Sequence, residues 1–336
     1  MRLFRALAHT LGMQEGLFAI DEAHVLHMWG SERSAFRPDY AALGMCLSRL
    51  SSWLTVAVTA TATAPTQQAI CAALSIPATN IYHELLDRPN IFISVSLCRD
   101  FPTQHSASYC SQLAKDFIFP LIRRSDSGHK FIVYGFNLST LSNVYVEVRD
   151  FLGTTLLVNP NGGDSFANHS VVLFSSIRGE AECASLASRL MDSESGLIGV
   201  IASSALGLGC VPACSIVLAH SLVCLVTRRA CIRLDSKFVN NVMIIGAPPS
   251  IEEFAQCMGR AGRAGQEATC SVVLRCVQRM TPEVVRHVLR TTGCRRDAIL
   301  CPFGQGASRE RALPSCCDNC RLEFAFRECR VNESDS

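Results

Sequence analysis

Short apolar runs alternate along the chain with longer segments in which apolar residues recur at helical spacing. The apolar runs predict β-strands at residues 17–20, 54–58, 130–134, 171–174, 197–202 and 242–245. The amphipathic segments predict helices at residues 65–74, 141–152, 179–191 and 251–258. Because predicted strands and helices alternate, we expect parallel α/β sheets.

Interruptions in this pattern indicate how the chain is divided. Polar residues and Pro102 break it near residues 94–108, and a cysteine-rich tail begins after residues 279–282. We therefore expect a first lobe at residues 1–95, a second lobe at 108–280, a small helical module at 281–325 and a tail at 326–336.

One segment of the second lobe differs abruptly in composition from its surroundings. Residues 211–238 are rich in Val, Leu, Cys and Ala and separate a strand from its expected continuation, so they look like an insertion. We hypothesise that this insertion is translated non-coding sequence, such as an unremoved intron. A surface loop or a hydrophobic hairpin is the alternative. Its apolar part is about 17 residues long and contains Pro212 and His220, so we do not expect a membrane span.

The composition adds limits on compartment and partners. The 336 residues are 49% hydrophobic and 18% charged, which is ample for two buried cores. A net charge of +2 does not by itself indicate nucleic acid, so any basic surface must be local. There are 18 cysteines and no visible secretory signal, which favours reduced thiols in an intracellular protein, with a subset binding metal.

Two carboxylates stand at the end of the first predicted strand, in the sequence Ile20-Asp21-Glu22-Ala23-His24. Parallel sheets bind ligands at the carboxyl ends of their strands. ATP hydrolysis needs one carboxylate to hold Mg²⁺ and another to orient or activate water, and Asp21 and Glu22 suit these two tasks. For these letters alone, a charged turn after a strand is a serious alternative.

Further motifs follow in order. The run Thr59-Ala60-Thr61-Ala62-Thr63 follows the second strand, and Trp29-Gly30 and Phe36–Tyr40 lie between it and the carboxylates. Aromatic residues in such a place can stack on bases of single-stranded nucleic acid, or they can be core. Arg88-Pro89-Asn90 and the Gly-rich stretch Ser203–Gly209 come later.

The most specific pattern is the stretch Gln256–Gly265, in which Arg260 and Arg263 alternate with small residues. Guanidinium groups there can stabilise the charge of a γ-phosphate in its transition state. An exposed basic helix end is the alternative for this stretch taken alone.

Taken together, these motifs resemble those of RecQ-family ATP-dependent DNA helicases. The resemblance implies two RecA-like parallel-sheet lobes, the first incomplete, followed by a small helical zinc-binding module. It implies unwinding of duplex DNA from 3′ to 5′ along one strand, driven by ATP and Mg²⁺, in recombination or repair and in the nucleus. Residues implied at the ATP site are Asp21, Glu22, His24, Gln256, Arg260 and Arg263. Residues implied to contact single-stranded or duplex DNA are Trp29, Phe36, Arg37, Thr59, Thr61 and Ser203.

The cysteine tail also resembles that family. Cys294, Cys317 and Cys320 match its zinc ligands, and Cys316 is the nearest candidate for the fourth, with Cys301 next. Adjacent cysteines rarely bind one metal comfortably, so the site is expected to be impaired. Buried cysteines without a metal are the alternative.

The chain also departs from the family. No G-x-x-x-x-G-K-[ST] sequence occurs in it, and the aromatic loop has about three extra residues within residues 31–35. We expect the chain to begin inside the first lobe, to leave sheet edges open, and to have little or no ATPase activity alone. The rival interpretations are a non-catalytic DNA- or protein-binding remnant and an RNA helicase, because Asp-Glu-Ala-His sequences occur in RNA helicases too.

Overall fold

The computed structural model describes residues 16–24, 53–98, 106–126, 128–153, 170–174, 180–203, 215–219, 222–226, 236–306 and 314–325. The chain divides into two compact units, Met1–Leu86 with Val211–Ala230 and Asp87–Cys210 with Cys231–Ser336. We expected the first lobe to extend to residue 95. The division instead falls between Leu86 and Asp87, because strand β3 (Ile91–Leu97) pairs within the sheet of the second unit.

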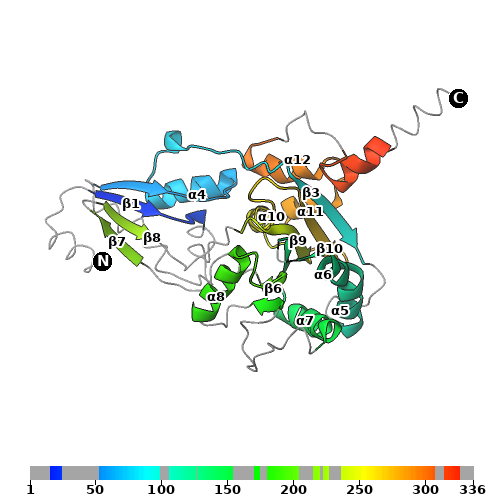
Figure 1. Ribbon diagram of the computed structural model, residues 1–336. Coiled ribbons are helices and arrows are strands. Elements are labelled where there is room, and N and C mark those ends of the chain that lie inside the picture. Colours follow the sequence, from blue (N-terminus) through cyan, green and yellow to red (C-terminus); the bar gives the residue numbers. More distant parts are fainter. Residues whose placement is uncertain are drawn as a thin grey trace. The chain divides into compact units, whose positions relative to one another are not determined.

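The first unit contains a four-stranded sheet in the order β2-β1-β8-β7 (Figure 1). Strand β1 (Gly16–Ile20) runs parallel to β2 (Trp53–Ala57), and Ile20 pairs with Ala57 at the carboxyl end. Helix α4 (Ala64–Leu74) follows, with a proline in its first turn, and the short helix η2 (Ala78–Asn80) comes next. The predictions of strands near 17–20 and 54–58 and of a helix at 65–74 are confirmed.

Part of the suspected insertion forms a hairpin in this first sheet. Strand β7 (Ser215–Ala219) pairs antiparallel with β8 (Leu222–Val226), and β8 lies parallel to β1 through Leu17 and Leu222. The structure therefore has the hairpin alternative at these residues. The hypothesis that the insertion is translated non-coding sequence stays a prediction that sequencing of the transcript tests. Among the described residues, no helix has the length and apolar character needed to cross a membrane.

The second unit is built on a six-stranded sheet in which every pairing is parallel. Its order is β3-β10-β9-β4-β6-β5. The further strands are β4 (Lys130–Gly135), β5 (Val171–Phe174), β6 (Gly199–Ser203), β9 (Val239–Ile245) and β10 (Ala268–Leu274). All six residues of β4 are buried, as expected for a central strand covered on both faces.

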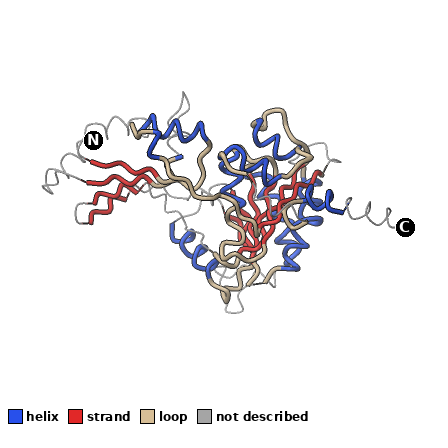
Figure 2. Tube along the Cα trace, turned by 90° about the horizontal axis from the view of Figure 1, so that it is seen from above, coloured by secondary structure: helices blue, strands red, loops and turns tan. Residues whose placement is uncertain are grey.

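Helices cover this sheet on both sides (Figure 2). One side carries α5 (Ala107–Leu113), the π-helical segment η3 (Ala114–Ile118), α6 (Phe119–Arg124) and α7 (Leu138–Leu152). Their buried side chains form one core with alternate residues of the strands, among them Phe131 and Val133 of β4. The unit also contains α8 (Glu180–Met191) and α10 (Ile251–Met258), and α10 contacts β9.

The cysteine-rich module attaches to the outer edge of β3. It comprises α11 (Glu283–Arg290), α12 (Arg295–Leu300), η6 (Cys301–Phe303) and a helix at residues 318–325. The Ile93 amide donates to the Cys316 carbonyl (3.2 Å), and the Val95 amide donates to the Asp318 carboxylate (2.9 Å). The module thus satisfies backbone groups that an edge strand would otherwise leave open.

Lys130, the first residue of β4, is fully buried beside the end of α8. Its ammonium group donates to the carbonyls of Arg189 (2.6 Å) and Asp192 (2.5 Å) and to the Ser195 hydroxyl (3.2 Å). A lysine suits these carbonyls because they carry the negative end of the helix dipole. Burial nevertheless lowers the pKa of Lys130 from 10.5 to about 8.

This lowered pKa gives a pH dependence of stability. Between pH 8 and 10.5 the unfolded chain binds more protons than the folded chain, so the free energy of unfolding rises with pH, by at most about 1.4 kcal/mol per unit. We expect Lys130→Met to lose this rise in the free energy of unfolding between pH 8 and 10.5. Lys115→Met, which changes an exposed lysine, should keep it. Urea unfolding of the three proteins from pH 7.5 to 10 measures it. Equal pH slopes for wild type and Lys130→Met would contradict the assignment.

Candidate functional site

The carboxylate motif forms a tight turn at the carboxyl end of β1. The Val58 amide donates to the Ile20 carbonyl (2.8 Å), and the Ala23 amide donates back to the Val58 carbonyl (2.9 Å). Glu22 has a φ of 53°, and its amide donates to the Asp21 carboxylate (2.9 Å). A non-glycine residue with positive φ costs on the order of 1 kcal/mol, and such residues concentrate at functional sites. The turn therefore holds both carboxylates at the strand end where ligands bind.

His24 joins this turn to the threonine-rich loop. Its side chain is buried, and its Nδ1 lies 2.9 Å from Thr59 Oγ1 and 3.4 Å from a Glu22 carboxylate oxygen. Because the Thr59 hydroxyl donates its only proton to the Thr61 carbonyl (3.1 Å), its oxygen must accept from Nδ1–H of His24. One imidazole proton thus links the carboxylate turn to the threonine-rich loop, which the sequence assigned to ATP binding and to DNA contact respectively.

The threonine-rich loop is itself held by side chains. Gln67 donates to the Ala62 carbonyl (2.8 Å), and the hydroxyls of Thr63 and Thr66 lie 2.9 Å apart. Thr61, in the middle of this loop, is buried. The other residues implied to contact DNA in this unit, Trp29, Phe36 and Arg37, lie outside the described residues.

In the second unit, Gln256, Arg260 and Arg263 belong to α10 and the loop after it. The Ser250 side chain begins α10 by accepting from the Glu253 amide (3.1 Å), and the helix ends at Gly259. We call residues 259–266 the arginine loop. Arg260 and Arg263 are both partly exposed in it, and the Arg263 side chain donates to the Gly259 carbonyl (3.3 Å).

Gly262 sets the shape of the arginine loop. It has a φ of 60°, and an added Cβ would come within 2.3 Å of the Asn90 side-chain nitrogen and 2.9 Å of the Gln266 carbonyl. Only glycine fits this position. The Gly262 carbonyl accepts from Arg88 (2.8 Å) and from Asn90 (2.9 Å), so the Arg88-Pro89-Asn90 motif holds the loop directly.

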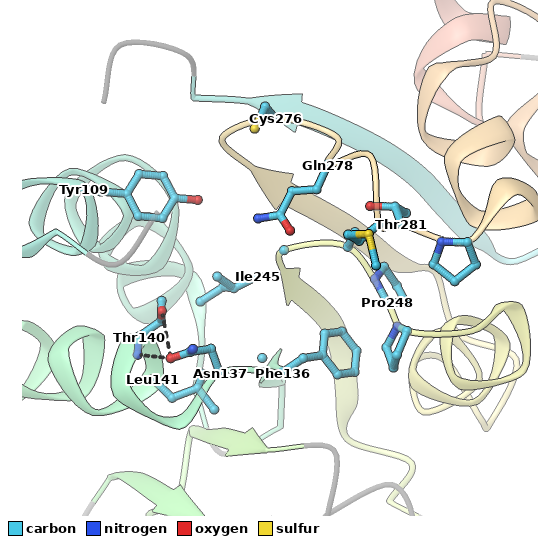
Figure 3. A pocket seen from close by; sticks show the side chains of 16 residues that line it. Tyr109, Phe136, Asn137, Thr140, Leu141, Ile245, Pro248, Cys276, Gln278 and Thr281 are labelled. Atoms are coloured by element: carbon cyan, nitrogen blue, oxygen red, sulfur yellow. Dashed lines mark hydrogen bonds between the residues drawn. The ribbon is translucent and has the colours of Figure 1, made fainter. Parts of the chain in front are cut away.

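A cavity of about 310 Å³ opens at the carboxyl ends of β4, β9 and β10 (Figure 3). Ser203, at the end of β6, pairs with Gly135, which lines this cavity. The Tyr109 hydroxyl and the Gln278 amide point toward the cavity, and Asn137 begins α7 beside it by accepting from the Thr140 amide (2.9 Å). None of these lining residues was predicted from the sequence. The Asn137-x-x-Thr140 cap directly after a strand is the signal that could have found part of them.

The structure brings Cys294, Cys316, Cys317 and Cys320 together, with all four sulfur atoms within 4.8 Å of one another. We call these residues the cysteine cluster. The Sγ atoms of Cys294 and Cys316 are 3.6 Å apart, close to the roughly 3.8 Å between sulfurs in a tetrahedral site with Zn–S bonds of about 2.3 Å. Cys316 and Cys317 both point into the cluster although they are adjacent. Cys301, the other candidate, is exposed and lies outside it.

Hydrogen bonding polarises these thiols. Hydrogen bonds from Cys294 and Cys316 lower the pKa of Cys317, whereas burial raises the pKa of Cys320 to about 12. The Arg296 Nε donates to Cys316 Sγ (3.4 Å), which also favours a negatively charged sulfur. Four convergent thiols leave no open ligand position, so a zinc ion here would fasten the module and would not act on a substrate.

The six-stranded parallel sheet with helices on both faces, bearing the arginine loop, is a RecA-like lobe, the fold of helicase motor domains. Among solved structures, Dbp5 of S. cerevisiae, bound to RNA and ADP BeF3, aligns with a TM-score of 0.52 and 12% identity over 90% of this chain and 61% of that chain. This likeness shows the fold alone.

Sequence comparison shows which helicases the chain resembles. The chain is 26% identical to ATP-dependent DNA helicase Q-like 2 of Arabidopsis thaliana, over 94% of this chain and 39% of that protein. It is 26% identical to ATP-dependent helicase wrn-1 of Caenorhabditis elegans, over 90% of this chain and 26% of that protein. It is 23% identical to the bifunctional 3'-5' exonuclease/ATP-dependent helicase WRN of Mus musculus, over 95% of this chain and 21% of that protein.

The chain is a relative of the RecQ-family helicases. It spans two fifths or less of the length of these three relatives. No protein-family model matches it.

The cysteine cluster makes a direct prediction about metal content. Zinc titrated into the chelator-stripped chain is expected to bind at about one ion per chain, because four thiols complete a structural site. Cys316→Ser is expected to lose this ion, whereas Cys301→Ser, which changes an exposed thiol outside the cluster, is expected to retain it. Elemental analysis after gel filtration measures both. Equal zinc content in the two variants would contradict the ligand set.

Proposed function

We propose that this chain is part of a RecQ-type DNA helicase that uses ATP and Mg²⁺ to move 3′ to 5′ along single-stranded DNA. In this proposal, Asp21 holds Mg²⁺ and Glu22 orients the attacking water. Arg260 and Arg263 stabilise the charge of the γ-phosphate in the transition state.

His24 and Gln256 have connecting roles in this mechanism. His24 hydrogen bonds to Thr59 and lies beside Glu22. A movement of the Glu22 carboxylate would therefore be passed to the threonine-rich loop through the His24 side chain alone. Gln256 lies on the helix that leads into the arginine loop and would carry the same signal on the second lobe. Coupling of this kind is what converts nucleotide turnover into movement along a strand.

DNA would be held mainly through phosphate contacts, with stacking by aromatic residues. Thr59, Thr61 and Ser203 are the proposed phosphate contacts, and Trp29, Phe36 and Arg37 the proposed contacts in the aromatic loop. The cavity next to Ser203 supports this assignment, because it lies at the carboxyl ends of the strands and presents hydroxyl and amide groups. With a net charge of only +2, binding must depend on such local contacts and be sensitive to salt.

The observation that carries the proposal is the cysteine cluster docked on the lobe that bears the arginine loop. Its backbone contacts with β3 make it an integral part of this lobe. Such a tail favours a DNA helicase over an RNA helicase, although the latter also uses Asp-Glu-Ala-His sequences. Roles in recombination or repair, and a location in the nucleus, are part of the proposal because they are expected of this family.

Nucleic-acid preference tests the proposal. We expect the chain to bind a 3′-tailed DNA duplex at least roughly tenfold more tightly than the matching RNA at low salt, with affinity falling as salt rises. Ser203→Glu places a negative charge beside the proposed phosphate path and is expected to weaken DNA binding, whereas Ser185→Glu, at an exposed position on α8, is not. Fluorescence anisotropy measures these affinities. Equal binding of DNA and RNA, or equal effects of the two variants, would count against the assignment.

Catalytic competence is a separate matter. The 336 residues contain no G-x-x-x-x-G-K-[ST] sequence, so nothing of that kind cradles the β- and γ-phosphates. We expect the DNA-dependent ATP turnover of this chain to equal that of its Asp21→Asn variant, at background level. A steady-state assay showing turnover that Asp21→Asn abolishes would overturn this expectation and support the remaining residues as a working site.

A further inference from the structure

Arg296 is the one arginine of the described residues that contacts both the cysteine cluster and the segment leading into β3. It is 4% exposed, at the start of α12. Its Nε donates to Cys316 Sγ (3.4 Å). Its two terminal nitrogens donate to the Asp87 carboxylate (2.9 Å) and to the carbonyls of Arg88 (2.8 Å) and Ile91.

Residues 87–90, which we call the connector, are held at one end by this guanidinium. Its partners are the Cys316 sulfur, the Asp87 carboxylate and the carbonyls of Arg88 and Ile91. The group is therefore a fixed cation that several acceptors surround. Removing it would take this donor from the Asp87 carboxylate and the Ile91 carbonyl, whereas the Arg88 carbonyl would keep the Ile91 amide (3.0 Å).

The connector in turn holds the arginine loop. The Arg88 side chain donates to the Gly262 carbonyl (2.8 Å) and the Ala261 carbonyl (3.4 Å). Asn90 donates to the carbonyls of Gly262 (2.9 Å) and Gln266 (2.7 Å), and its own carbonyl accepts from the Ala268 amide (3.0 Å). The backbone carbonyls of Gly262 and Gln266, which lie on either side of Arg263, therefore both accept hydrogen bonds from the connector.

We propose that Arg296 is a positioning residue that makes the geometry of the arginine loop depend on metal occupancy of the cysteine cluster. The path runs from Cys316 through the Arg296 guanidinium to the Arg88 carbonyl, and from the Arg88 side chain to the Ala261 and Gly262 carbonyls. The action of the arginine loop on a triphosphate rests on the proposed function. The coupling between the cysteine cluster and the arginine loop does not depend on that function.

The direction of the coupling follows from charge. A zinc ion held by four thiolates leaves the cluster with a net negative charge, which strengthens hydrogen bonds from a neighbouring guanidinium. Without the metal, the Arg296 Nε donates to a sulfur that no ion fixes in place. Arg296 then loses one of its anchors, and the connector loses the orientation that Arg296 gives it.

Arg295 supplies a matched control. It is the preceding residue and is equally buried, at 7% exposed, but its partners are Asp318, Asn319 and the carbonyls of Val288 and Leu289. All of these lie in the cysteine-rich module. Arg295→Gln should weaken the module without touching the connector, whereas Arg296→Gln should release the connector.

Hydrogen exchange of the 336-residue chain tests the coupling without any enzymatic assay. We expect removal of zinc by a chelator to speed exchange roughly tenfold in peptides covering residues 259–268, where the amides of Gly262, Gly265 and Ala268 are hydrogen bonded. In Arg296→Gln the loop should exchange fast with zinc bound, and zinc removal should add nothing. In Arg295→Gln the zinc dependence should remain.

Several outcomes would overturn the proposal. One is wild-type exchange in the arginine loop that is the same with and without zinc. Another is an Arg296→Gln chain with the zinc dependence of wild type. A chain that retains no zinc would overturn it too. If Arg296→Gln does not fold, Arg296→Lys keeps the charge but cannot reach all the acceptors, and is expected to show partial loss of the zinc dependence. Each readout is independent of DNA binding, so its failure is distinguishable from failure of the proposed function.

Discussion

The carbonyl oxygen of Gly262 accepts hydrogen bonds from Arg88 and Asn90, which lie more than 170 residues earlier in the chain, and from the Gly265 amide (3.0 Å). Because donors reach this oxygen from three directions, the backbone at Gly262 has one orientation relative to the connector. That orientation requires a positive φ and no Cβ, and it sets where Arg260 and Arg263 leave the backbone. The chemistry proposed for these arginines thus depends on a main-chain oxygen that no arginine motif, read alone, would single out.

The same contact explains why β3 belongs to the second sheet. The connector enters directly into β3, which pairs along its whole length with β10, while β10 itself follows the arginine loop. Residues 316–318 cover the outer edge of β3. The Ile93 amide donates to the Cys316 carbonyl there, and the Val95 amide donates to the Asp318 carboxylate. Connector, edge strand, arginine loop and cysteine cluster are therefore one hydrogen-bonded assembly, in which each part limits the movement of the next.

Sequence patterns predicted the strongly apolar elements of this fold well. Strands β4, β5 and β9 contain apolar runs at residues 131–134, 171–174 and 242–245, and hydrophobicity alone located them. Strands β3 and β10 were missed, because serines and a threonine interrupt them and resemble a boundary. They are strands because each has a long-range partner, including the contact between the hydroxyls of Ser94 and Ser271 (3.0 Å). Tertiary pairing overrode the local pattern there.

Some parts of the candidate sites could likewise be predicted from the sequence, and others could not. Motif letters were enough to select the four cysteines that converge, whereas the hydrogen bond between His24 and Thr59 joins residues to which the sequence had given separate roles. The cavity could not be predicted, because its lining comes from four separate stretches of the chain that only the sheet brings together. Arg296 was missed for a related reason: its role lies in partners some 205 to 209 residues away, which no spacing rule reveals.

The first unit shows how a carboxylate turn can be kept without a phosphate-binding sequence in the chain. Strand β1 has a neighbour on each side, β2 along its whole length and β8 at Leu17. The carboxyl end of β1 is held by β2, through the pairing of Ile20 with Ala57 and the hydrogen bond from the Val58 amide to the Ile20 carbonyl (2.8 Å). The hairpin supplies that second neighbour but carries no glycine and no lysine in its strands, so it has nothing with which to cradle a phosphate. Support for the turn and binding of the triphosphate are thus separable properties. A segment that satisfies the first need not provide the second, which is consistent with a Mg²⁺-type carboxylate pair in a chain that we expect to be a poor ATPase alone.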